Sequence, residues 1–125
     1  MGNEIYDDLD ELPTAPRIDI PEADLVLLER AGHAIGAVHV EVVDGEGYVN
    51  LRFADGSVVH SWNPLMFSGD AFELAVKLNI HVLRFQTMAT AHPLVASWGC
   101  DERDNGDPMG ATRRAITRAA SQIGK

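Results

Sequence analysis

Five polar and aromatic residues in the middle and second half of the chain have the chemistry of a ligand site. They are Trp62, Asn63, Ser68, Asp70 and Trp98. Indole faces stack on flat ligands, and the free N–H groups at a helix start bind anions. The turn around Ser68 is predicted to open a helix, so these residues together indicate a site for a small molecule or a nucleotide.

The same residues also have a structural interpretation. Ser68 is predicted to cap the helix with its hydroxyl, and Asp70 meets the positive end of the helix dipole. Phe67 and Phe72 have the spacing of a hydrophobic staple across that cap. On this interpretation Trp62 and Trp98 hold the helices against a sheet, and no ligand is required. Both interpretations stay open at the level of the sequence.

The remaining reactive side chains lack a catalytic or metal-binding pattern. Five histidines are scattered without zinc-ligand spacing, although His39 and His60 would approach each other if their strands were neighbours. Cys100 has no nearby cation before Arg103, which predicts a passive thiol. The sequence has no glycine-rich phosphate loop and no nucleophile elbow. We therefore expect no enzymatic activity, no metal and no cofactor. The histidines are His33, His39, His60, His81 and His92.

Charge is concentrated at the N-terminus. The chain has a net charge of -9, and residues 1–24 contain eight acidic side chains against one basic residue. This balance disfavours nucleic-acid binding, which needs clustered Lys and Arg. We predict an acidic, disordered tail over residues 1–17, which either keeps the protein in solution or occupies a basic groove on a partner. The candidate partner-binding residues are Asp7, Asp8, Asp10 and Glu11.

Residues 18–125 are expected to form a single domain that begins with a helix after Pro21. Alternating apolar residues then predict three strands, over residues 38–43, 48–53 and 58–62. Glycine-containing turns at Asp44–Gly47 and Asp55–Gly56 separate these strands, so they are predicted to form an antiparallel meander.

The second half is predicted to contain a helix from Ser68 that stops at Asn79, a strand over 80–85, a loop over 87–93 and a strand over 94–98. An exposed connection, 101–106, then leads to a helix capped by Asp107. On this last helix Met109, Thr112, Ile116, Ala119 and Ile123 are predicted to share one face, and Arg114 and Arg118 to complement its C-terminus. The fold class is α+β, with about five strands in a mainly antiparallel sheet and three helices packed on it, in the order α-β-β-β-α-β-β-α.

Residues 62–124 resemble small phage and prophage proteins of the α-β-α sandwich type and, more weakly, phage NinX-like proteins. The resemblance rests on four elements in order, with Gly69 where threonine is usual. They are Phe67-Ser68-Gly69-Asp70, Ile80-His81-Val82, Ala96-Ser97-Trp98, and Gly106-Asp107-Pro108 followed by Arg114-Ala115. It implies a sheet with helices on both faces and a phage or prophage accessory protein, and it assigns no catalytic residue.

Together these observations predict a non-enzymatic accessory protein that binds a host or phage protein, and the alternative is a small-molecule or nucleotide-binding module. The lone Cys100 and the absence of a signal peptide or membrane span predict the cytoplasm of a bacterial host. An exposed sheet edge favours a homodimer.

Overall fold

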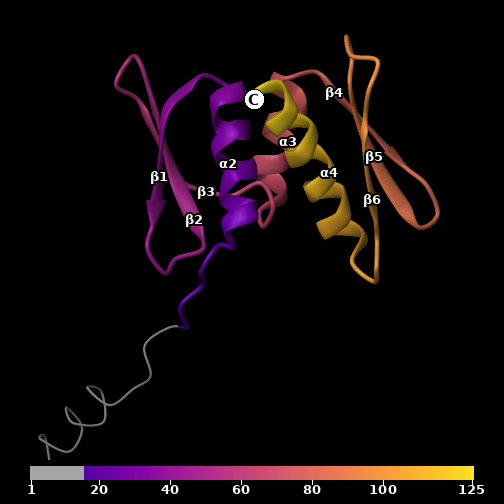
Figure 1. Ribbon diagram of the computed structural model, residues 1–125, viewed down its shortest axis with the longest axis horizontal. Coiled ribbons are helices and arrows are strands. Elements are labelled where there is room, and N and C mark those ends of the chain that lie inside the picture. The colour runs from indigo at the N-terminus through magenta and orange to yellow at the C-terminus, as the bar shows by residue number, and fades with distance from the viewer. Residues whose placement is uncertain (1–15) are drawn as a thin grey trace, which may run out of the picture.

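The computed structural model describes residues 16–125, which fold into three helices and two three-stranded sheets (Figure 1). The elements in chain order are α2 (Glu22–Ala34), β1 (Ala37–Val43), β2 (Tyr48–Phe53), β3 (Val58–Trp62), α3 (Ser68–Lys77), β4 (Ile80–Arg84), β5 (Met88–Pro93), β6 (Cys100–Arg103) and α4 (Pro108–Ile123). The α+β class and the order of helices and strands are confirmed, with one strand more than predicted.

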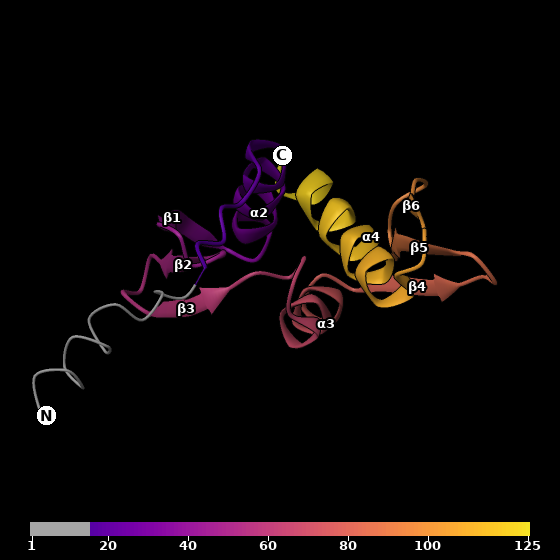
Figure 2. The same cartoon turned by 90° about the horizontal axis from the view of Figure 1, so that it is seen from below.

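The helices lie between the two sheets (Figures 1 and 2). Strands β1–β2–β3 form the first sheet and β4–β5–β6 the second, and both are antiparallel. The prediction of one five-stranded sheet with helices on it is therefore wrong. The chain leaves the first sheet at Asn63-Pro64 and passes through α3, so β4 starts a new sheet instead of extending the old one. A membrane span needs about 20 apolar residues, and no helix between residues 16 and 125 meets that requirement.

The first sheet is the predicted meander, and its turns depend on glycine. Gly45, Gly47 and Gly56 have φ angles of 74°, 76° and 88°, which side-chain-bearing residues rarely adopt. Helix α2 packs on this sheet through Leu28 and Ala31, which are fully buried with Val49 and Leu51.

The second sheet differs from the sequence prediction. Met88–Pro93 is strand β5 rather than a loop, Leu94–Trp98 is a turn region rather than a strand, and the predicted exposed connection contains β6. Ala89 and Ala91 are fully buried in β5 and alternate with half-buried neighbours. Alanine is uncommon in strands, so alternating alanines do not predict a strand from the sequence alone.

The helix ends follow the predictions in part. The side chain of Asp107 accepts a 2.9 Å hydrogen bond from the Gly110 N–H and Pro108 is the first residue of α4, as expected. Asn79, with φ of 51°, follows the end of α3 in the left-handed region. Ser68, however, is the first residue of α3, and Phe67 occupies the N-cap without a side-chain hydrogen bond. The predicted Ser68 cap is therefore wrong.

Helix α4 contacts all three strands of the second sheet and both other helices. Its buried face consists mainly of small side chains, whereas Met109, predicted on that face, is 60% exposed. Arg114 donates to Asp24 of α2 at 2.7 Å, and Arg118 donates to Glu102 of β6. These arginines link α4 to its neighbours and do not complement the end of their own helix.

Candidate functional site

Trp62 and Asn63, predicted as ligand-binding residues, belong to the interior. Trp62 is 1% exposed at the end of β3 and is part of the hydrophobic core. Asn63 is 4% exposed and ties the β3–α3 turn together. Its Nδ2 donates to the Gly47 carbonyl at 2.7 Å, and its Oδ1 accepts from the Leu65 N–H at 2.9 Å. The structural interpretation therefore accounts for Trp62, and Asn63 has a structural role in the turn although it also borders a cavity of about 310 Å³.

The structure brings Asp70 to Asn63 but does not bring the two tryptophans into one site. Asp70 Oδ2 accepts a 2.9 Å hydrogen bond from the Asn63 N–H. Burial raises the pKa of Asp70, and that hydrogen bond opposes the rise. Trp98 lies in the connection between β5 and β6 of the second sheet, whereas Trp62 ends a strand of the first.

A groove lies between α3, α4 and β4, and we call it the α3–α4 groove. It has a volume of about 530 Å³. Helix α3 supplies Ala71, Phe72, Ala75 and Val76, strand β4 supplies Ile80 and Val82, and α4 supplies Met109 and Ile116; the polar lining is Ser68, Thr112 and Arg113. Most of the lining is therefore aliphatic or aromatic, and of the five predicted ligand residues only Ser68 belongs to it.

The rim of the groove exposes large apolar side chains. Phe72 is 68% exposed, Val76 59% and Met109 60%. Phe72 does not form the buried staple that its spacing with Phe67 predicts, since Phe67 is also exposed. The sequence contains a signal for this rim: Phe72 and Val76 are four residues apart on α3, beside the buried stripe of Ala71 and Leu74.

Arg113 supplies the positive charge of the groove. Its Nε donates to the Leu65 carbonyl at 3.0 Å and its Nη1 to Ser68 Oγ at 3.2 Å. Both contacts are to neutral oxygens, and within residues 16–125 Arg113 has no carboxylate partner, unlike Arg114 and Arg118. Arg113 also lines two further cavities, of about 360 and 310 Å³. Its guanidinium is thus held in place while its charge remains available to an anion.

The histidines are arranged differently from the sequence prediction. His39 is on β1 and His60 on β3, and β2 lies between these strands, so the condition for their approach is not met. His81 and His92 instead face each other across β4 and β5. This pair was missed because 87–93 was predicted to be a loop. Among residues 16–125 no group of three or more His, Cys, Asp or Glu side chains is placed to hold a metal ion.

Cys100 is buried on β6. Burial raises the pKa of its thiol, an effect that nearby Arg118 opposes, so the neutral thiol is favoured. The predicted partner-binding residues of the acidic tail, Asp7, Asp8, Asp10 and Glu11, lie outside the described residues.

Comparisons with known proteins yielded no match to this chain among family models, curated proteins or solved structures. The resemblance to phage proteins therefore stays a prediction, and the functional argument depends on the geometry of the α3–α4 groove.

Proposed function

We propose that the protein is a non-enzymatic binding module that holds a small amphipathic molecule, with an apolar body and an anionic group, in the α3–α4 groove. One observation carries the proposal: an open, apolar groove has a single cation, Arg113, in its lining. The anionic group would accept hydrogen bonds from Arg113, and the apolar body would lie along Ala75, Val76 and Val82.

The size and chemistry of the groove support this ligand class. Small-molecule sites have volumes of about 300–1,000 Å³ and a mainly apolar lining with few polar groups. Apolar surface removed from water contributes about 25 cal/mol per Å², and the exposed rim of Phe72, Val76 and Met109 provides such surface. A charge-assisted hydrogen bond to Arg113 then fixes the orientation of the ligand.

This proposal develops the second alternative raised by the sequence, a small-molecule or nucleotide-binding module, and favours an aliphatic acid over a nucleotide. The sequence predicted that Trp62 would stack on a nucleotide base, and Trp62 is enclosed in the core. The aromatic side chain at the groove is Phe72, and Arg113 is the one cation among the described residues of its lining. An aliphatic acid needs no aromatic face. Binding of a partner protein through the acidic tail stays a prediction, because the proposed tail residues lie outside the described part of the chain. Phage origin and homodimer formation stay predictions as well.

The test compares decanoate with decanol, which share an apolar chain but differ in charge, by isothermal titration of the full chain. We expect decanoate to bind more tightly. Arg113→Ala should weaken decanoate binding by about tenfold or more, since a hydrogen bond to a charged group is worth roughly 1.5–3 kcal/mol, and should leave decanol nearly unchanged. Arg103→Ala is the matched control, because Arg103 is exposed on β6 and does not line the groove.

A second variant tests the place of binding. Ala75→Phe inserts an aromatic ring into the groove while Arg113 is kept, and it should abolish binding of both ligands, with circular dichroism as the check on folding. Undiminished binding by Ala75→Phe, or equal affinity of Arg113→Ala and the original chain for decanoate, would overturn the proposal.

A further inference from the structure

The outer face of the second sheet carries a pair of histidines that lies outside the α3–α4 groove. His81 of β4 and His92 of β5 are direct partners in the antiparallel register. Directly opposite residues project from the same face with their Cβ atoms about 4.5–5.5 Å apart. The two imidazoles are therefore held side by side by the backbone of the sheet.

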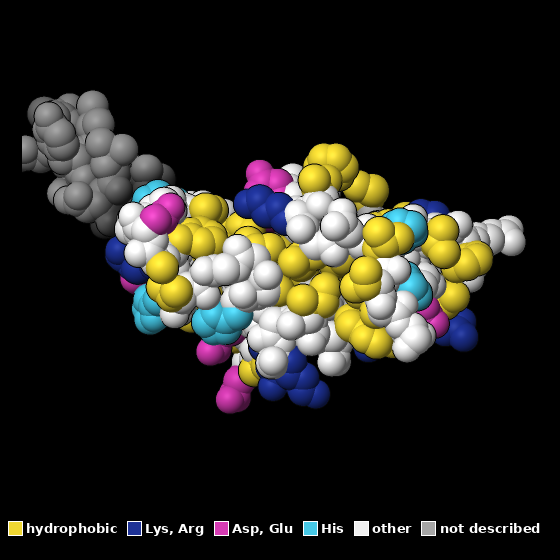
Figure 3. Space-filling view, turned by 90° about the horizontal axis from the view of Figure 1, so that it is seen from above, with side chains coloured by type: hydrophobic (Ala, Val, Ile, Leu, Met, Phe, Trp, Pro, Cys, Tyr) yellow, Lys and Arg dark blue, Asp and Glu magenta, His cyan; other side chains and the backbone are white. Residues whose placement is uncertain are grey.

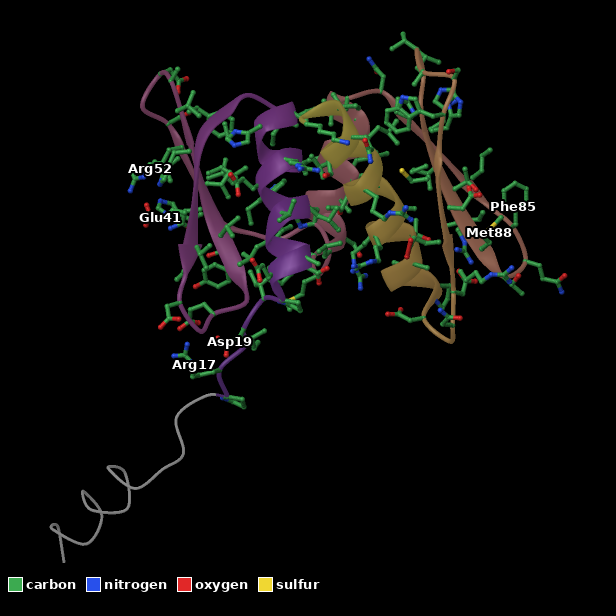
Figure 4. All side chains as sticks on the ribbon, viewed as in Figure 1. Arg17, Asp19, Glu41, Arg52, Phe85 and Met88 are labelled. Carbon is green, nitrogen blue, oxygen red and sulfur yellow. The ribbon has the colours of Figure 1, made fainter. Side chains whose placement is uncertain are left out.

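The side of the sheet on which they lie follows from the alternation along each strand. Ile80 of β4 and Ala89 and Ala91 of β5 are buried toward the helices, so His81 and His92 project from the opposite face. Phe85 and Met88, at the turn between the same strands, also point away from the helices (Figure 4). Figure 3 shows histidine side chains at the surface of this half of the molecule.

Neither imidazole has another partner within residues 16–125. Among the described histidines, only His33 has a polar partner for its side chain: it forms a hydrogen bond with the Ala37 carbonyl and an ion pair with Glu29. Gly99 lies beside His92: a Cβ on this glycine would stand 3.5 Å from His92 Cδ2. With glycine at that position, residue 99 places no side chain against His92.

We propose that His81 and His92 form a two-histidine chelate for a divalent transition-metal ion such as Zn²⁺. Neutral imidazole nitrogens suit zinc, copper and nickel, with Zn–N distances of about 2.0–2.1 Å. The structure supplies two ligands, so water completes the coordination and the ion exchanges with solvent. Asp101 of β6, hydrogen-bonded to Thr90 Oγ1 at 2.7 Å, adds negative charge on the same face.

The experiment titrates the full, metal-free chain with Zn²⁺ at neutral pH. Calorimetry measures the affinity and the number of ions bound, and NMR spectra report which histidine rings shift. We expect one ion per chain, with selective shifts of two histidine rings. His81→Ala and His92→Ala should each lower the affinity at least about tenfold, since loss of even an outer-shell partner costs 10–100-fold. The control is His60→Ala, an exposed histidine of the first sheet, which should leave binding unchanged.

Two outcomes would overturn the proposal. One is no detectable Zn²⁺ binding by a chain whose NMR spectrum shows it to be folded. The other is binding that His81→Ala and His92→Ala leave intact, which would place the ion elsewhere. Because both side chains are on the outer face and outside the core, the variants are expected to fold, and unchanged far-UV circular dichroism verifies this.

Discussion

The two three-stranded sheets share one topology, but they pack against the helices with side chains of different size. The first sheet meets α2 through Val49 and Leu51, with Leu28 opposite, and is closed at one end by Trp62. The second sheet meets α4 through Ala89 and Ala91, and α4 presents mainly alanines in return. Large side chains fill the first interface, whereas small ones let helix and strand approach closely in the second.

This difference explains where the α3–α4 groove lies. Ala71 and Ala75 of α3 line the groove, and side chains this short leave a hollow between α3, β4 and α4. Several of the largest core side chains lie around the first sheet, where Leu28, Leu51 and Trp62 are almost fully buried. The core thus runs through both halves of the molecule, and the groove lies where short side chains of α3 meet β4 and α4.

Removal of the largest core side chain should have the greatest effect. Trp62→Ala is expected to lower the free energy of unfolding by about 3–5 kcal/mol, because Trp62 is 1% exposed. Trp98→Ala, on the β5–β6 connection of the other sheet, should cost less than about 1 kcal/mol, since Trp98 is 38% exposed. Urea unfolding measures both, and equal losses would mean that the two halves depend equally on their tryptophans.

Enlargement of a small side chain at the second interface should have the next largest effect. Ala91→Leu is expected to cost about 1–3 kcal/mol, because the added volume has no space between β5 and α4. Thr90→Ser, on the opposite face of the same strand, keeps the hydroxyl that donates to Asp101 and should change the unfolding free energy by less than about 1 kcal/mol. If Ala91→Leu unfolded at the same urea concentration as the original chain, the close approach of β5 and α4 would be contradicted.

The smallest expected effect concerns pH. Arg84 of β4 makes a bidentate contact with Asp104, at 2.7 and 2.6 Å, and this hydrogen bonding lowers the pKa of the Asp104 carboxyl. The ionised carboxylate is favoured in the folded state, so its stabilising contribution is present at neutral pH. It is lost as the pH falls from the unfolded value of about 3.9 through the lowered folded value.

In Asp104→Asn the free energy of unfolding should therefore decrease less steeply as the pH falls below about 4, as measured by urea unfolding at a series of pH values. Arg84→Gln should give the same change, and the double variant no more than either single one. Additive changes in the double variant would show that the two side chains act separately. On the first sheet the exposed pair Arg52–Glu41, at 3.3 Å (Figure 4), provides the comparison, and Glu41→Gln should cost less than about 1 kcal/mol.

The fold could be predicted where local chemistry and tertiary packing agree. Glycine turns and alternating valines identify the first meander, and Asp107 with Pro108 identifies the start of α4. Strand β5 could not be identified in the same way, because its inward residues are alanines and its outward residues include Thr90 and His92. Its strand character comes from pairing with β4 and β6 and from contact with α4, which are properties of the folded chain.

The candidate site was predictable to a smaller extent. The sequence places Ser68 at the start of α3, and Ser68 does line the groove, but the groove also needs β4 and α4, which are brought together only by tertiary structure. The sequence could not single out Arg113. Arg114 and Arg118 have carboxylate partners in the described structure and Arg113 has none, and this difference is visible only in the folded chain. The pairing of His81 with His92 depended on a strand that the sequence did not reveal.

The central place of α4 has a consequence for the order in which the protein acquires its structure during synthesis. The strands of the first meander contact one another over short stretches of chain, so they have their partners soon after they leave the ribosome, whereas α2 packs more extensively on α4 than on the meander. The second sheet packs on α4, and Arg114 reaches Asp24 across 90 positions of sequence. Until residues 108–123 have been translated, the alanine faces of β5 and the apolar side of α3 have no cover, and in that interval the nascent chain is most exposed to proteases and chaperones.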